Sequence, residues 1–140
     1  MKMISLLHLC ICFYGSAFSQ GTITLQVEGI ELKKGGQLSI AIFDESNFLK
    51  IGRQLRALEV EVISEKMEIN LEKVTMGTYA IAVFQDIDRN HELKTNFIGF
   101  PQEPIGFSND AHIKFGPPSF RDAQFKIEKG DSVVLKISLR

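Results

Sequence analysis

Most of the chain after residue 20 alternates apolar and polar residues with a period of two, and this pattern limits the possible folds most strongly. The alternating segments are residues 22–27, 38–42, 58–62, 67–72 and 133–139. Successive side chains of a strand point to opposite faces, so each segment buries one face and exposes the other. One solvated face is typical of antiparallel sheets. We therefore predict an all-β chain rather than a helical bundle or a parallel sheet wrapped by helices.

Residues 79–84 depart from this alternation, because all six are apolar. A strand that is apolar on both faces is expected at the centre of a sheet, covered on both sides. We expect a further strand over residues 120–127, with Ala123, Phe125 and Ile127 facing inward. Seven or eight short strands separated by turns predict a two-sheet antiparallel sandwich.

Residues 45–57 contain the one candidate for a helix. Asp44 or Ser46 provides an N-cap there, because a short polar side chain can accept a hydrogen bond from the free N–H groups of a first turn. Gly52 weakens the helix, because glycine carries a large entropic cost inside one. A loop with one helical turn is an equally good interpretation.

The N-terminal segment has the pattern of a secretory signal peptide. A start containing lysine leads into an apolar run at residues 4–14, and Ala17 and Ser19 are small residues suited to a cleavage site. The run is too short for a transmembrane helix, which needs roughly 20 apolar residues. We predict a signal peptide at residues 1–19 and a single β-sandwich domain at residues 20–140, secreted or periplasmic after cleavage.

Cysteine content and charge exclude several classes of function. Both cysteines, Cys10 and Cys12, lie in the segment that cleavage removes, so we expect neither disulfides nor thiol chemistry in the mature chain. Sixteen basic and 17 acidic residues give a net charge of −1, which does not suit a nucleic-acid-binding protein. No hydrophobic stretch after the signal peptide is long enough to predict a transmembrane segment.

The segment between residues 96 and 120 is rich in proline, glycine and phenylalanine. Its prolines and aromatic residues are Pro101, Pro104, Pro117, Pro118, Phe97, Phe100, Phe107, Phe115 and Phe120. Such a segment is expected to form a long ordered loop packed by its own side chains. Its phenylalanines are predicted to be buried, with three of them (Phe100, Phe107 and Phe115) plugging one end of the sandwich. Long loops on rigid scaffolds also carry function, and the two roles are compatible.

A polar loop directly after the central strand resembles a calcium-binding loop. The side chains whose oxygens could converge on one cation are those of Asp86, Asp88, Asn90 and Asn96. Three features depart from such loops: His91 stands where the sharp turn favours glycine, and Lys94 and Phe97 stand where later ligands are expected. These positions fit either a weak calcium site or an Asx-rich turn that ends a strand.

Four sequence blocks resemble the DUF2141 family of bacterial exported proteins. The blocks are residues 77–86, 96–101, 103–109 and 116–123, and with the intervening polar loop they cover most of the domain. The resemblance implies a small exported β-sandwich, similar to immunoglobulin-like or transthyretin-like modules, and no assigned activity. The usual family loop carries a second aspartate where this chain has Lys94, which puts a cation site in this chain in doubt.

We predict a non-catalytic exported module that presents its 86–120 loops to an unidentified protein or small ligand. A weakly calcium-binding version of that module is the alternative, and no other cofactor is expected. Carbohydrate binding is disfavoured, because the mature chain has no Trp and Tyr79 lies in the predicted central strand.

A small extracytoplasmic enzyme is the least favoured hypothesis. The groups available for acid–base or metal chemistry are those of His91, His112, Asp86, Asp88 and Glu92. A nucleophile elbow, an H-E-x-x-H motif and a reactive cysteine are all missing from the sequence of the mature chain. We therefore predict that the chain is not an enzyme.

Overall fold

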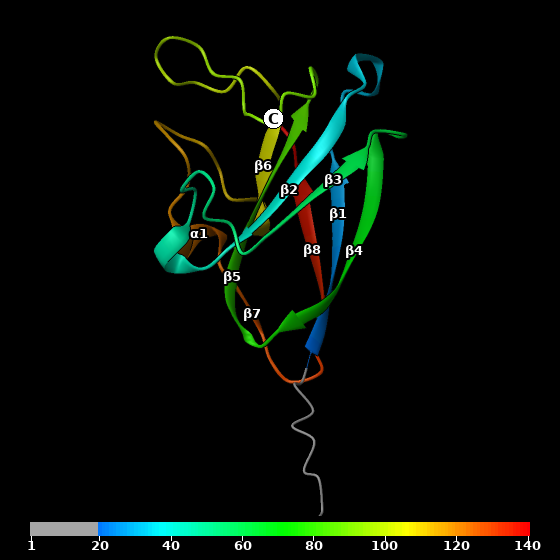
Figure 1. The fold of residues 1–140 in the computed structure, drawn as a ribbon, viewed down its shortest axis with the longest axis vertical. Coiled ribbons are helices and arrows are strands. Elements are labelled where there is room, and N and C mark those ends of the chain that lie inside the picture. Colours follow the sequence, from blue (N-terminus) through cyan, green and yellow to red (C-terminus); the bar gives the residue numbers. More distant parts are fainter. Residues whose placement is uncertain (1–19) are drawn as a thin grey trace, which may run out of the picture.

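The computed structural model describes residues 20–140, which form an all-β sandwich of two sheets (Figure 1). The first sheet has the order β4-β1-β8, formed by Lys66–Thr75, Gln20–Glu28 and Ser132–Ser138. The second has the order β3-β2-β5-β6, formed by Arg56–Glu61, Gln37–Phe43, Gly77–Asp86 and Ile105–Phe107. A short strand β7, Phe125–Ile127, also pairs with β5. The predicted signal peptide lies outside the described residues.

Strand β5 is the centre of the second sheet, as its apolar sequence predicts. Its residues 80–86 pair with β2 along one edge, while β6 and β7 share the other edge. One face of β5 packs in the core between the sheets, with Ile81 and Val83 fully buried. Its other face contributes Ala80 and Ala82 to a second cluster of buried residues. The prediction that this strand is covered on both sides is therefore confirmed.

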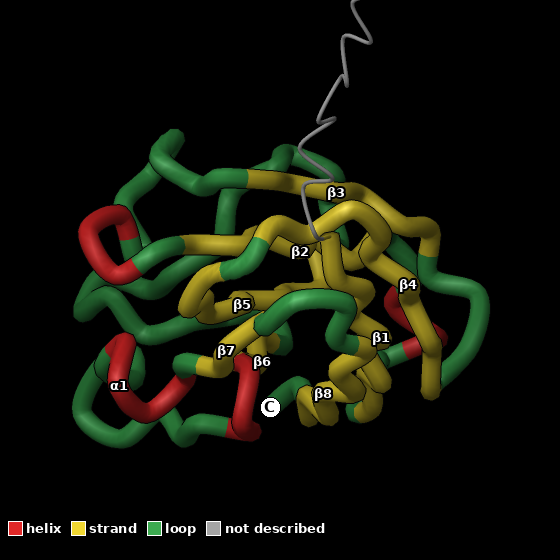
Figure 2. The backbone as a smooth tube through the Cα atoms, turned by 90° about the horizontal axis from the view of Figure 1, so that it is seen from below, coloured by secondary structure: helices red, strands yellow, loops and turns green. Residues whose placement is uncertain are grey.

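The second cluster lies on the outer face of the β5 sheet, beneath two long connections. Phe48, which follows the short 3-10 helix η2 (Glu45–Asn47), makes edge-to-face contacts with Phe43, Phe107 and Phe120 at centroid distances of 6.0, 6.5 and 5.6 Å. Figure 2 shows α1 and the neighbouring loops beside β5 and β7, away from β4. This cluster anchors the loops that follow β6.

One local prediction needs correction, and another is confirmed. Residues 120–123 form a helical turn, α1 (Phe120–Ala123), and the strand begins only at Phe125. The cause is a cap: the Ser119 hydroxyl accepts a hydrogen bond from the Asp122 N–H at 3.2 Å and so starts a helix. In residues 45–57 the one-turn interpretation is confirmed, because η2 is a single turn and the Asp44 carboxylate accepts a hydrogen bond from the Asn47 N–H at 2.9 Å.

One strand pairing is parallel, although the sequence predicts antiparallel sheets. β1 pairs with β4 in antiparallel and with β8 in parallel orientation. β1 and β8 lie near opposite ends of the domain in the sequence, so no short turn joins them. Their connection therefore does not fix the direction of one strand relative to the other. A period-two pattern reports which face of a strand is buried but not its direction.

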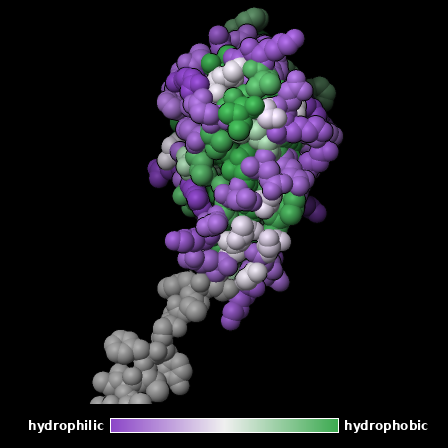
Figure 3. Space-filling model, turned by 90° about the vertical axis from the view of Figure 1, so that its right-hand side faces the viewer, coloured by the Kyte–Doolittle hydropathy of each residue, from purple (hydrophilic) through white to green (hydrophobic). Residues whose placement is uncertain are grey.

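The side of the sandwich formed by β3 and β4 is open. Each of these strands is the outer strand of its sheet, and the side chains of Leu58, Val60 and Met67 are only partly buried there. Figure 3, which views this side, shows apolar surface between polar borders. None of the helices among residues 20–140 is long and apolar enough to cross a bilayer.

Candidate functional site

The loop after β5 is held at its base by a buried carboxylate. Asp86, at the end of β5, is 0% exposed. Its Oδ1 accepts a hydrogen bond from the Asn90 N–H at 3.1 Å, and its Oδ2 accepts from the His91 N–H at 2.9 Å and from Gln37 Nε2 at 3.2 Å. Burial by itself raises the pKa of Asp86, but these hydrogen bonds outweigh burial, so the pKa lies below its ordinary value.

A second buried carboxylate, Glu103, closes the same loop from its far end. Glu103 is 5% exposed, and its oxygens accept hydrogen bonds from the N–H groups of Ile87 and Lys94, both at 2.9 Å. The sequence analysis missed this residue. Its sequence neighbours, Pro101, Gln102 and Pro104, gave no signal of burial, because an acid in a proline-rich loop is ordinarily exposed.

Gln85 is a third buried polar residue next to the loop. Its side chain accepts a hydrogen bond from the Glu31 N–H at 2.9 Å and donates to the carbonyl oxygens of Glu31 and Gly35 at 3.0 and 2.7 Å. Gly36, at φ +79°, lies against the Asp86 carbonyl, where a Cβ would collide with the backbone. Within residues 20–140, every buried side-chain nitrogen and oxygen has a hydrogen-bond partner.

Two of the four predicted calcium ligands, Asp86 and Asp88, have carboxylate oxygens close together, and the side-chain oxygens of the two asparagines accept hydrogen bonds within their own turns. The Asn90 side-chain oxygen accepts a hydrogen bond from the Glu92 N–H at 2.8 Å, and the Asn96 oxygen accepts from the N–H groups of Ile98 and Phe100 at 3.1 and 2.9 Å. Both asparagines therefore shape turns. Glu103 joins the two aspartates: carboxylate oxygens of Asp86, Asp88 and Glu103 lie within 4.8 Å of one another.

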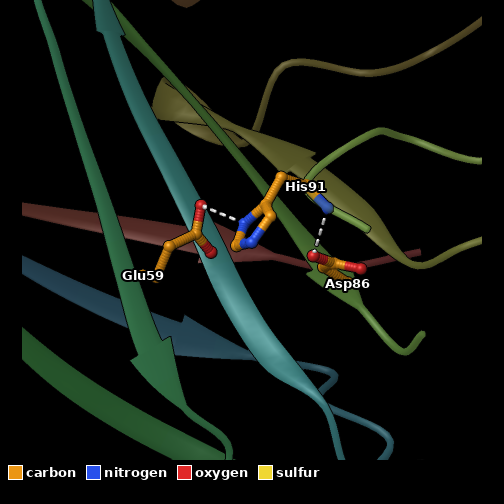
Figure 4. Close-up of side chains that lie close together, drawn as sticks. All are labelled: Glu59, Asp86 and His91. Carbon is orange, nitrogen blue, oxygen red and sulfur yellow. Dashed lines mark hydrogen bonds and ion pairs between the residues drawn. The ribbon is translucent and has the colours of Figure 1, made fainter. Parts of the chain in front are cut away.

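Of the five residues considered for catalysis, His91 and Asp88 each lie close to Asp86, whereas His112 and Glu92 belong to neither group. His91 lies close to Glu59 and Asp86, with one ligand atom from each within 4.8 Å of the others (Figure 4). His112 belongs to neither metal-type group found among residues 20–140 and instead lines a cleft. Glu92 is exposed.

That cleft, with a volume of about 540 Å³, lies between the loops before and after β6. Its apolar lining includes Phe100, Pro104, Ile105, Phe107 and Ile113. Two cationic residues, Lys114 and Arg140, also line it, and Arg140 forms an ion pair with Asp110 at 2.9 Å. The cleft can hold an apolar group next to positive charge.

The aromatic residues around this cleft are more exposed than the sequence predicts. Phe107 is buried, but Phe97 is 99% exposed, and Phe100 and Phe115 are exposed as well. The prediction that Phe100, Phe107 and Phe115 plug one end of the sandwich is therefore wrong, because Phe100 and Phe115 are exposed and Phe107 is buried in the cluster on the outer face of the β5 sheet. The physical reason is that Phe48, on the connection between β2 and β3, packs against Phe43, Phe107 and Phe120 and so fills the space beside the sheet. The two loops with exposed tips project on the same side of the molecule (Figure 1).

A comparison with known protein families finds one match. A family model described as "Uncharacterized protein conserved in bacteria (DUF2141)" matches residues 25–134. The match extends from β1 into β8 and includes both loops and the buried carboxylates. No curated protein and no solved structure matches the chain significantly.

Proposed function

The chain belongs to the DUF2141 family, and from this premise we propose that it is a non-catalytic, exported binding module. It presents the 86–120 loops and receives an apolar group of its ligand in the cleft between them. The observation that carries this proposal is the cleft of about 540 Å³ beside exposed aromatic loop tips. Exposed apolar patches next to a concave site are a common mark of binding surfaces.

The lining of the cleft defines the ligand class. Ile105 and Phe107 provide a buried apolar floor. The lining also has two cations, Lys114 and Arg140, and two acids, of which Glu31 is paired with Lys34 and Glu103 with backbone N–H groups. An apolar body with an anionic end satisfies both features, because each part then meets its complement. The expected ligand is a small amphipathic anion, or a protein side chain next to an acidic group.

The dye 1-anilinonaphthalene-8-sulfonate tests this proposal, because it combines an aromatic body with a sulfonate. We expect saturable binding with enhanced fluorescence, and at least tenfold weaker binding to the Ile113→Asp variant. Ile63→Asp is the matched control, because Ile63 is exposed between β3 and β4, on the open side of the sandwich. Loss of dye binding in Ile63→Asp with retention in Ile113→Asp would place the apolar site on that open side and contradict the proposal.

A non-catalytic role is supported by the separation of the acid–base groups. His112 lines the cleft, whereas His91 and Asp86 belong to a different cluster. General acid–base catalysis requires its groups within hydrogen-bond reach of one substrate. The cleft is lined by one histidine and two carboxylates. Both carboxylates are already engaged, since Glu103 binds backbone N–H groups and Glu31 forms an ion pair with Lys34.

Export is part of the same proposal and rests on the pattern of residues 1–19. The test is the mass of the protein recovered from the periplasm or medium of a bacterial host. A mature N-terminus at Gln20 is the expected result. Recovery of the uncleaved chain from the cytoplasm alone would contradict export.

Calcium binding is the second candidate function, favoured by the Asp86, Asp88 and Glu103 carboxylates. Glu103 supplies the late acid that the loop sequence lacks, and hard cations prefer such oxygen ligands. A cation would also reduce the repulsion among three neighbouring carboxylates. The site would use Glu103 instead of Asn96 as its distant ligand.

Thermal unfolding tests this second candidate. A bound ion stabilises the native state, so the melting temperature should rise between excess EDTA and millimolar calcium. The Asp88→Asn variant should lose most of this rise, while Glu92→Gln, an exposed acid in the same loop, should keep it. An unchanged melting temperature in the wild type would exclude calcium binding at this concentration.

A further inference from the structure

We propose that Glu59, Asp86 and His91 form a binding site for a divalent transition-metal ion, with Zn²⁺ as the representative. The three residues come from β3, from the end of β5 and from the loop that follows it. Each offers one ligand atom, and the three atoms lie within 4.8 Å of one another. Figure 4 shows the three side chains gathered around β2.

The strand register explains why these residues meet. On β2, Gln37 lies opposite Asp86 of β5, and Ser39 lies opposite Glu59 of β3. Glu59 and Asp86 therefore flank β2 across one face of the second sheet. The N–H of His91 donates to Asp86 Oδ2 at 2.9 Å, which holds the histidine above the same region.

The distance between the ligand atoms of His91 and Glu59 fits the coordination of zinc. His91 Nδ1 and Glu59 Oε1 are 3.6 Å apart, beyond ordinary hydrogen-bond distance. In a tetrahedral zinc site with bonds of roughly 2.0–2.1 Å, neighbouring ligand atoms are about 3.3–3.4 Å apart. Small side-chain adjustments therefore bring this pair to coordination distance. Three protein ligands leave a fourth position for water, as in open zinc sites.

The side-chain NH₂ group of Gln37 is an electropositive group that already lies between two of the proposed ligands. Its Nε2 is 3.2 Å from His91 Nδ1 and 3.2 Å from Asp86 Oδ2. Two acceptors thus point toward one amide nitrogen. A cation satisfies the same two acceptors, and rotation of the Gln37 amide would then present its oxygen toward the ion.

Hydrogen bonds from neighbouring groups orient two of the ligands. The Ser39 hydroxyl donates to Glu59 Oε1 at 2.7 Å, and the N–H groups of Asn90 and His91 fix Asp86. Such outer partners are typical of metal sites, where they hold the ligands in place and influence affinity. The buried ligand Asp86 is therefore preorganised.

The ligand set distinguishes this site from the calcium candidate. Imidazole nitrogen is a preferred ligand of zinc, copper and nickel, whereas calcium takes oxygen ligands. The two candidates share Asp86 but differ in their remaining residues, His91 and Glu59 against Asp88 and Glu103. They can therefore be separated by the choice of ion and of variant.

The experiment is a zinc titration of the chain without an affinity tag, followed by NMR of the histidine rings and by calorimetry. We expect one saturable zinc site and a zinc-induced shift of the His91 ring signals. The His112 ring signals should not move at one equivalent, because His112 belongs to the cleft. Calcium at the same concentration should leave both rings unchanged.

Variants give the second readout. His91→Asn is the chosen substitution because His91 has φ +62°, a conformation that asparagine tolerates. His91→Asn and Glu59→Gln should each weaken zinc binding by at least about tenfold, the loss typical even of outer-shell changes. His112→Asn and Asp88→Asn should keep the wild-type affinity. The proposal would be overturned if zinc left the NMR signals of the His91 ring unchanged, or if His91→Asn and His112→Asn bound zinc with equal affinity. If a variant does not fold, the ring signals of the wild type still decide between the outcomes.

Discussion

The 86–120 loops reverse the usual distribution of polar and apolar residues between their base, which lies next to the sheet, and their tips, which lie in solvent. At the base, the charged groups of Asp86 and Glu103 are buried and bound to backbone N–H groups. At the tips, the rings of Phe97 and Phe115 extend into solvent. Buried charges that are fully hydrogen-bonded give a loop one defined conformation. Exposed rings contribute little to stability, and under the proposed function these rings are available to contact a ligand.

The 86–120 loops thus combine a rigid anchor with the surface that we propose for binding. Asp86 and Glu103 accept hydrogen bonds from the backbone, whereas Phe97 lies in the turn between Asn96 and Gly99, and Phe115 lies in the loop between η3 (Ser108–Asp110) and α1. The base is therefore expected to control stability, and the tips are expected to control binding. The following predictions test this division.

The largest effect is expected for Asp86→Ala. The change leaves the N–H groups of Asn90 and His91 and the Gln37 amide without their acceptor, at a cost of about 3 kcal/mol in the free energy of unfolding. Urea unfolding measures it. Asp88→Ala, an exposed acid two residues away, is the control and should cost less than about 1 kcal/mol. Equal costs for the two variants would contradict the anchoring role of Asp86.

Glu103→Gln should have an intermediate effect. The amide keeps one acceptor for the N–H groups of Ile87 and Lys94 but places an NH₂ group against the other, costing about 1–2 kcal/mol. Urea unfolding again measures the change. Glu92→Gln in the same loop serves as the control. If the Glu103→Gln protein were as stable as this control, the base of the loop would be held by contacts other than those of Glu103.

Lowering the pH should reduce the free energy of unfolding by less than either substitution at the base of the loop does. The pKa of Asp86 is lowered from its ordinary value of 3.8, so the unfolded chain takes up this proton at a higher pH than the folded chain does. The resulting stabilisation is present above pH 3.8 and is lost as the pH falls below it through the folded-state pKa. Urea midpoints measured between pH 5 and 2 should fall less steeply for Asp86→Asn than for the wild type. Parallel slopes would show that other carboxyl groups dominate the acid response.

The smallest effect on stability is expected at the tips. Phe97→Ser and Phe115→Ser should change the free energy of unfolding by no more than about 0.5 kcal/mol, because neither ring is buried. Phe107→Ser, in the buried floor of the cleft, is the contrasting variant and should unfold much more readily. A loss of stability at Phe97 comparable with that at Phe107 would show that the tip packs against the domain.

The fold was predictable because alternation is a local property of the chain. Ile23, Leu25 and Val27 alternate with polar neighbours, and the structure buries all three. The covered central strand was equally evident from residues 79–84. The helical turn that Ser119 caps was not predicted, because residues 120–127 were interpreted as one strand.

The candidate site was predictable only in part. Asp86 and Asp88 stand in a recognisable spacing, and their carboxylates do lie close together. Glu103 and Glu59 are distant in sequence from that loop and have no local signal that joins them to it. They reach the site because β3, β2 and β5 are neighbours in one sheet and because residues 94–104 fold back toward β5.

Sequence alone therefore determined which faces of the strands are buried, where the central strand lies and which segment forms the irregular loops. Those properties follow from side-chain polarity at a fixed spacing along the backbone. Tertiary structure decided the parallel pairing of β1 with β8, the burial of Glu103 and the exposure of Phe97. Each of these depends on which distant segment already occupies the neighbouring space, because a packed interior accepts only one set of side chains.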